Sequence, residues 1–103
     1  MRISEFAFQV NAKLIIKSDC GRFFCTLERG PKFDGGLVAW LLKDYSSLTT
    51  AKIISGSGES PDAALNDYIR KIKGQNISFP DDINGTSRRY RKRYKVPKSL
   101  SVS

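Results

Sequence analysis

Residues 60–74 read SPDAALNDYIRKIKG, and this stretch decides the fold. Ser60 is a preferred N-cap residue, and Pro61 suits the first position of a helix. Gly74 stands where a residue of left-handed conformation often ends a helix. Four apolar residues recur at the spacing i, i+3, i+4 and i+7 and form one stripe: Leu65, Tyr68, Ile69 and Ile72. The pattern predicts an amphipathic helix over residues 61–73 whose stripe is buried.

Runs rich in β-branched and aromatic residues lie on both sides of this helix and predict strands. The predicted strands cover residues 5–10, 12–17, 22–28, 49–55 and 76–79. Residues 37–45 fit either a strand or a short buried helix, because periodicity alone cannot assign a short apolar run. A single amphipathic helix has to bury its stripe, and a sheet is the partner available. We therefore expect an α+β fold, an antiparallel sheet of four to five strands with one helix packed on one face.

The composition limits the chemistry available to the chain. It has 103 residues, no histidine and two cysteines, so the commonest general base is missing and a zinc site cannot be completed from thiolates and imidazoles. Cys20 and Cys25 are expected to be free thiols. No carboxylate set or cofactor loop is recognisable, so the sequence predicts no catalytic activity, no cofactor, no bound metal and no small-molecule substrate.

Two further segments bear on ligands and on membranes. Residues 56–61, GSGESP, join a predicted strand to the helix, a place where backbone N–H groups can bind phosphate. Their spacing matches neither the dinucleotide fingerprint nor the P-loop, which indicates an ordinary turn. The longest apolar run, residues 37–42, is too short to cross a bilayer. We expect a cytoplasmic protein with no membrane partner.

Positive charge is concentrated at the C-terminal end of the chain. Residues 83–103 contain seven of the 18 Lys and Arg side chains and no acidic residue, although the net charge of the whole chain is only +8. Such an asymmetry favours a polyanionic or acidic partner. We expect residues 1–86 to form the globular body and residues 87–103 to form a basic C-terminal segment, an edge strand followed by a short flexible tail.

Within the basic segment, aromatic and cationic residues alternate. At a period of two, Tyr90, Tyr94 and Val96 share one face, interrupted only by Lys92. The other face carries four cations: Arg89, Arg91, Arg93 and Lys95. A helix would also bring the two tyrosines together but would scatter the charges, so we prefer the strand. Two interpretations of the cations stay open: they only prevent association of sheet edges, or they contact phosphates while the tyrosines stack on bases.

The predicted site for nucleic acid or a protein partner consists of the residues that make up this alternation and its flanks. They are Arg88, Arg89, Tyr90, Arg91, Lys92, Arg93, Tyr94 and Lys95.

The order of a strand ending in ISGSG, a helix opening with PDAAL, a short strand and a basic-aromatic segment resembles small proteins of bacteriophage and prophage genomes. Some small phage proteins inhibit host defences, including CRISPR effectors, so one expectation that the resemblance implies is an anti-CRISPR-like inhibitor. The order of strands and helix is also similar to the double-stranded-RNA-binding fold, but residues 61–65 lack the Lys-Lys-x-Ala-Lys opening of its RNA-binding helix.

Two functional hypotheses follow from the charge and the resemblance. The first is a phage-encoded, non-enzymatic protein whose basic C-terminal segment binds nucleic acid. The second is an inhibitor that binds a host nucleic-acid-processing or defence complex. Both need cations, so charge alone does not separate them.

Overall fold

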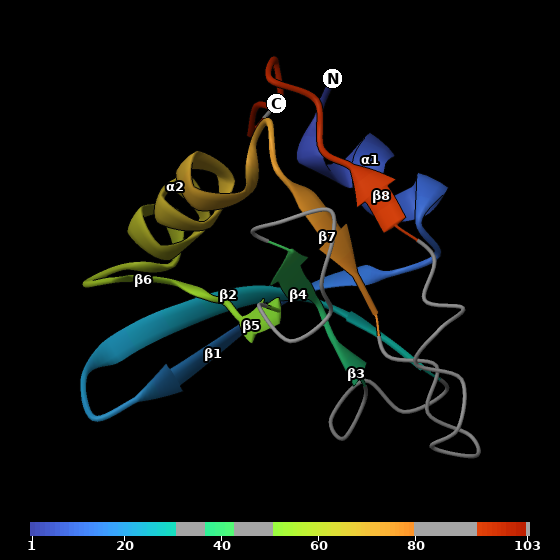
Figure 1. The fold of residues 1–103 in the computed structure, drawn as a ribbon. Coiled ribbons are helices and arrows are strands. Elements are labelled where there is room, and N and C mark those ends of the chain that lie inside the picture. Colours follow the sequence, from blue (N-terminus) through green and yellow to red (C-terminus); the bar gives the residue numbers. More distant parts are fainter. Residues whose placement is uncertain (31–36, 43–50, 80–92, 103) are drawn as a thin grey trace.

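A computed structural model describes residues 1–30, 37–42, 51–79 and 93–102 (Figure 1). The described helices and strands are, in chain order, α1 (Ile3–Gln9), β1 (Lys13–Asp19), β2 (Arg22–Arg29), β3 (Leu37–Val38), β4 (Trp40–Leu42), β5 (Ala51–Ile53), β6 (Gly56–Gly58), α2 (Pro61–Ile72), β7 (Asn76–Ser78) and β8 (Arg93–Lys95). The expected α+β class with antiparallel strands is confirmed. No helix in the described part of the chain is long and apolar enough to span a membrane.

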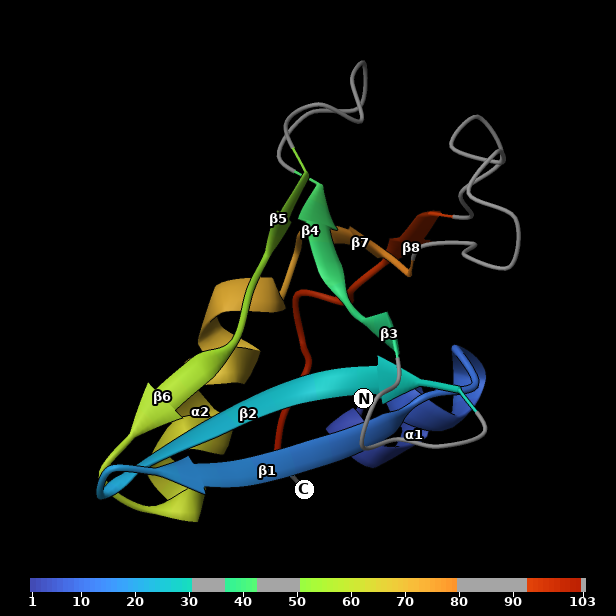
Figure 2. The same cartoon turned by 90° about the horizontal axis from the view of Figure 1, so that it is seen from below.

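The strands divide between two four-stranded sheets. In the first sheet, β2 pairs with β1 along one edge, and with β3 and β6 along the other. The second sheet has the order β5-β4-β7-β8. Only Ala39 separates β3 from β4, so the chain passes there from the first sheet to the second, and it returns from β5 to β6. Helices α1 and α2 both lie behind the first sheet in Figure 2.

Helix α2 forms where the sequence predicts it. Ser60 Oγ accepts a hydrogen bond from the Ala63 N–H at 3.1 Å, and Gly74 has a φ of +77°. The helix packs on β6 and β2 and buries three of the four residues of the predicted stripe, Tyr68, Ile69 and Ile72, together with Ala64. The prediction that Leu65 is buried is wrong, because Leu65 is only partly buried and packs at the margin of the core.

The predicted strand over residues 5–10 is wrong, because residues 3–9 form helix α1. The buried residues follow a helical spacing: Ile3, Phe6, Ala7 and Val10. Phe8, which suggested alternation with Phe6, is 87% exposed. The Arg2 N–H donates to Glu5 Oε1 at 3.3 Å, which helps to satisfy the first turn of the helix.

The chain end after β8 packs on the body, although a short flexible tail was expected there. Val96 and Leu100 are buried in the core. The Ile3 N–H donates to the Ser101 carbonyl at 2.8 Å, and the Ser101 N–H donates to the Met1 carbonyl at 2.9 Å. These contacts join the two ends of the chain and hold α1 in place.

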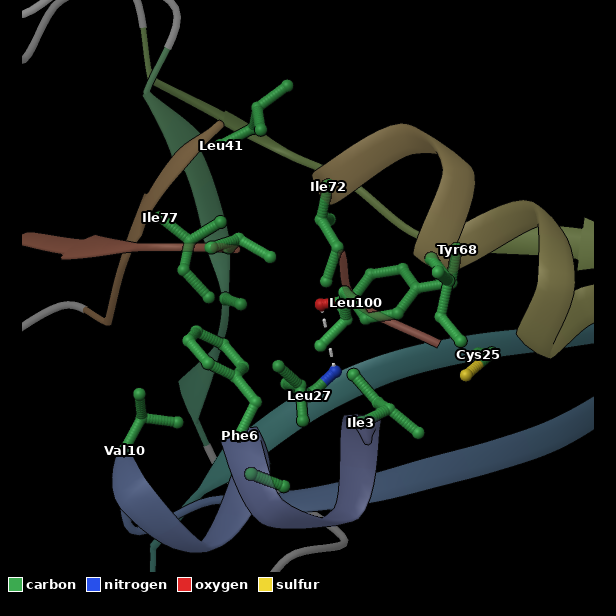
Figure 3. Packing of buried hydrophobic residues seen from close by; sticks show 14 of the residues in the cluster. Ile3, Phe6, Val10, Cys25, Leu27, Leu41, Tyr68, Ile72, Ile77 and Leu100 are labelled. Carbon is green, nitrogen blue, oxygen red and sulfur yellow. Dashed lines mark hydrogen bonds between the residues drawn. The ribbon is translucent and has the colours of Figure 1, made fainter. Parts of the chain in front are cut away.

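Strands β6 and β3 both pair with the same edge of β2, and Tyr68 fills the gap between them. Since β6 pairs with Phe23–Cys25 and β3 pairs with Glu28–Arg29, the Leu27 N–H has no strand partner there. The hydroxyl of Tyr68 accepts a hydrogen bond from this N–H at 3.1 Å (Figure 3). The helix thus completes the backbone pairing of the sheet on which it packs.

Candidate nucleic-acid interface

Three of the eight predicted site residues lie in β8: Arg93, Tyr94 and Lys95. Arg88, Arg89, Tyr90, Arg91 and Lys92 lie outside the described residues. Strand β8 is at the edge of the second sheet and pairs with β7, so that Arg93 is opposite Ser78 and Lys95 is opposite Asn76.

The alternation predicted for the basic segment holds in β8. Arg93 and Lys95 are exposed, whereas Tyr94 is half-buried and Val96, the next residue on the Tyr94 face, is fully buried. The Tyr94 ring meets the Phe79 ring edge to face, with 6.4 Å between centroids. The cations and this tyrosine therefore lie on opposite faces of the sheet, and Tyr94 belongs to the core side.

Arg29, at the end of β2, fixes the inner face of β8. Its guanidinium lies 4.3 Å from the centroid of the Phe79 ring and 5.4 Å from that of Tyr94. Its Nη2 donates to the Tyr94 hydroxyl at 2.9 Å and also to the Val10 carbonyl. A guanidinium stacked on two rings in a partly buried site is favourable. Arg29 thus connects α1, the first sheet and the edge of the second sheet. Sequence reasoning missed it, because a single arginine at a strand end carries no pattern.

The outer face of the second sheet presents one row of residues in register across all four strands. From β5 to β8 the row is Ile53, Trp40, Ser78 and Arg93. Trp40 is partly exposed, and Ile53 is 62% exposed. Sequence reasoning also missed Trp40, since it lies in the run 37–45 that fitted either a strand or a helix. Within that run the structure describes two short strands, β3 and β4, and residues 43–45 lie outside the described part.

The strands of the second sheet contain cationic residues and no acidic residue. The acidic residues that the structure describes lie on α1, on the first sheet, or in and just before α2: Glu5, Asp19, Glu28, Glu59, Asp62 and Asp67. Glu28 is buried and forms an ion pair with Lys17 at 3.5 Å. No described carboxylate in the second sheet therefore offsets the positive charge of Arg93 and Lys95.

The predicted turn is wrong for residues 56–58, because they form strand β6 and pair with β2. The two glycines of this strand allow α2 to pack on it. A Cβ on Gly56 would lie 2.3 Å from the Ala64 carbonyl oxygen and 2.3 Å from the Tyr68 nitrogen, so only glycine allows the helix to approach β6 this closely. The Ser57 N–H, which a phosphate would use, already donates to Asp67 Oδ2 at 2.9 Å.

The Asp67 carboxylate is held by three donors. The ammonium group of Lys71 lies 2.9 Å from Oδ2, and Arg70 binds Oδ1. The side chain of Lys71 and the backbone N–H of Ser57 hold the pKa of Asp67 well below its usual range. The carboxylate therefore compensates positive charge within α2 and fastens the helix to β6.

Cys20 and Cys25 are both free cysteines. Cys20 is exposed at the β1–β2 turn, and Cys25 is buried. Burial raises the pKa of the Cys25 thiol to about 12, which keeps it neutral and unreactive. Within the described residues, no group of three or more potential metal ligands comes together.

No family model, no curated protein and no solved structure matches this chain.

Proposed function

We propose that this protein is a non-enzymatic binding protein whose basic C-terminal segment engages nucleic acid. The observation that carries the proposal is the pair Arg93 and Lys95, side by side on the exposed face of an edge strand. Residues two apart on a strand are separated by roughly 6.6 Å, so the two charges form a short row. Arg88, Arg89, Tyr90, Arg91 and Lys92 precede this row in the sequence and extend its charge.

The charge distribution favours a polyanion over a small ligand. Arg93 and Lys95 form no ion pair with a described residue, and their own sheet carries no acidic residue in its strands. Phosphate contacts of this kind supply sequence-independent affinity that depends strongly on salt. The chain has no histidine, and the acidic residues that the structure describes are occupied in capping or pairing or lie apart from one another, which favours binding without catalysis.

The test compares two variants with the same loss of charge. Arg93→Gln with Lys95→Gln removes the row, and Arg22→Gln with Lys13→Gln removes two exposed charges of the first sheet as a matched control. Fluorescence anisotropy of a labelled oligonucleotide, measured from about 50 mM salt upward, gives the dependence of log K on log salt. We expect the first variant to flatten the slope by about 1.8 on duplex DNA, since each lost contact removes about 0.9. An equal effect of the control variant contradicts a defined site.

A four-site variant extends the test to the part of the row outside the described residues. Neutralising Arg89, Arg91, Arg93 and Lys95 together should flatten the slope by roughly 3–4 on duplex DNA. Wild-type protein that binds neither duplex nor single strands at about 50 mM salt, where phosphate contacts are strongest, refutes the proposal.

A second proposal is that the protein is phage-encoded and inhibits a host nucleic-acid-processing or defence complex. The exposed position of β8 at a sheet edge favours it, because such an edge can add a strand from another protein and its cations can steer association. Capture of a nucleic-acid-processing complex from a nuclease-treated bacterial lysate by the wild type, but not by the four-site variant, supports this function. Capture that disappears with nuclease treatment supports nucleic-acid binding instead.

A further inference from the structure

Trp40, the only tryptophan of the chain, lies on the outer face of the second sheet. Its neighbour Leu41 points into the core together with Ile77, toward the side on which Ile72 and Phe6 lie (Figure 3). Because side chains alternate along a strand, Trp40 points to the opposite face. Its cross-strand partner on β5, Ile53, is strongly exposed, so this part of the face is open to solvent.

The other side of Trp40 leads to the cations. Ser78 of β7 is opposite Trp40, and Arg93 of β8 is opposite Ser78. With neighbouring strands about 4.8 Å apart, the backbones of Trp40 and Arg93 are separated by roughly 10 Å, a distance that two long side chains cover. Lys95 lies on the same face, two residues along β8 from Arg93. An aromatic ring thus has two cations on one side and an apolar side chain on the other.

Ser78 stands between Trp40 and Arg93 in this row and is fully buried, so it does not contact a ligand. The contacts to a ligand on this face therefore fall to Trp40 on one side and to Arg93 and Lys95 on the other.

We infer that the outer face of the second sheet binds single-stranded nucleic acid, with one base stacked on Trp40 and the neighbouring phosphates on Arg93 and Lys95. This inference rests on the proposed nucleic-acid function and specifies its ligand. A ring on a sheet face can stack only on a base that is not already stacked within a duplex. Tyr94 cannot take this role, because its ring lies on the inner face against Phe79.

The single tryptophan allows a direct test. An oligothymidylate of about 16 nucleotides, the upper end of the site size of a small single-strand-binding fold, is titrated into wild-type protein while tryptophan fluorescence is recorded. Anisotropy of the labelled strand is measured in parallel. We expect quenching of Trp40 with the same midpoint as the anisotropy change, and much weaker quenching by a duplex of equal length. Equal quenching by the duplex overturns the preference for single strands.

Variants of the ring give the magnitude. Stacking contributes about 1–3 kcal/mol per base, so Trp40→Ala should weaken single-strand binding by roughly 5- to 150-fold. Trp40→Phe keeps a ring and should lose less. Phe8→Ala, which removes the 87% exposed ring of α1, is the matched control and should leave binding unchanged. If Trp40→Ala does not fold, Trp40→Phe and the wild-type quenching still decide the question.

Failure of the inference is distinct from failure of the proposed function. One result is that single strands bind the wild type without any change in Trp40 fluorescence and bind the Arg93→Gln, Lys95→Gln variant more weakly. This result refutes base stacking and leaves phosphate binding intact. Absence of any binding at about 50 mM salt refutes both.

Discussion

Replacing Tyr68 by Phe tests the contact that joins α2 to the first sheet. The variant keeps the ring and its packing but removes the hydroxyl that accepts a hydrogen bond from the Leu27 N–H at 3.1 Å. Both residues are fully buried, so water does not replace the lost acceptor. A buried donor left without a partner costs about 1–3 kcal/mol. In a domain of this size, 1 kcal/mol lowers the Tm by about 4–8 °C.

Urea denaturation followed by circular dichroism measures the effect at neutral pH. We expect a lower midpoint with an unchanged m value, because the surface exposed on unfolding stays the same. Tyr94→Phe is the matched control. It removes a hydroxyl that accepts from Arg29 in a half-buried site, where Arg29 keeps the Val10 carbonyl as a second acceptor, and it should cost less than Tyr68→Phe. A loss below about 0.5 kcal/mol for Tyr68→Phe refutes the role assigned to this hydrogen bond.

Alkaline pH gives the same prediction a second measurement. Burial raises the pKa of Tyr68 to about 12, from an ordinary value of 10.0. The contribution of this group to stability is therefore complete below pH 10 and is lost as the pH rises toward 12, by about 1.4 kcal/mol per pH unit. Tyr68→Phe has no such group, so the difference in stability between wild type and variant should shrink over this range. Cys25 titrates in both proteins and cancels in the comparison.

Three further substitutions test the packing of the fold. Gly56→Ala places a Cβ 2.3 Å from backbone atoms of α2 and should lower the free energy of unfolding by about 1–3 kcal/mol or more, measured by urea denaturation. Gly21→Ala is the control, because its Cβ meets open space and only the φ of +82° is unfavourable, so it should cost about 1–2 kcal/mol. Equal losses for the two variants contradict the close approach of α2 to β6. The lowered pKa of Asp67 means that its contribution to stability is present above its ordinary pKa of 3.8 and is lost as the pH falls below it, so Asp67→Asn should be less stable at neutral pH and less sensitive to acid; parallel acid curves contradict this. Leu100→Ala should cost about 2–5 kcal/mol and Val102→Ala, at a site 42% exposed, less than about 0.5 kcal/mol; a thermal melt that does not distinguish them contradicts the docked C-terminus.

Helix α2 and the β1–β2 hairpin could be predicted because their signals are local. Ser60, Pro61 and Gly74 mark the ends of the helix within its own sequence, and the hairpin turns at Cys20 and Gly21, which both have positive φ. The two-residue alternation in β8 is local in the same sense. The alternation predicts that the cations and Tyr94 lie on opposite faces of the strand, and β8 has this arrangement.

Helix α1 and the division into two sheets depend on contacts between distant parts of the chain. The sequence of α1 satisfies both a period of two and a helical period, and the choice is made by burial against the core and by the hydrogen bond from Ile3 to Ser101. The passage from β3 to β4 turns on Ala39, whose N–H donates to the Leu27 carbonyl at 3.0 Å. No local sequence pattern at residues 37–42 indicates that the chain changes sheets at Ala39. The roles of Arg29 and Trp40 were missed for the same reason, since each depends on which strands become its neighbours.

The position of β8 separates what stabilises the strand from what its cations can do. Tyr94 and Val96 hold the strand from the inner side, through the Phe79 ring, the Arg29 guanidinium and the core. Arg93 and Lys95 point outward and form no ion pair with a described residue. Exposed charges without partners contribute little to folding, within about 0.5 kcal/mol.

Protection of the sheet edge requires charge but not a uniform sign, whereas phosphate binding requires positive charge. Reversing the sign with Arg93→Glu and Lys95→Glu should therefore keep the thermal stability and abolish nucleic-acid binding. Retained binding assigns these two side chains to edge protection alone.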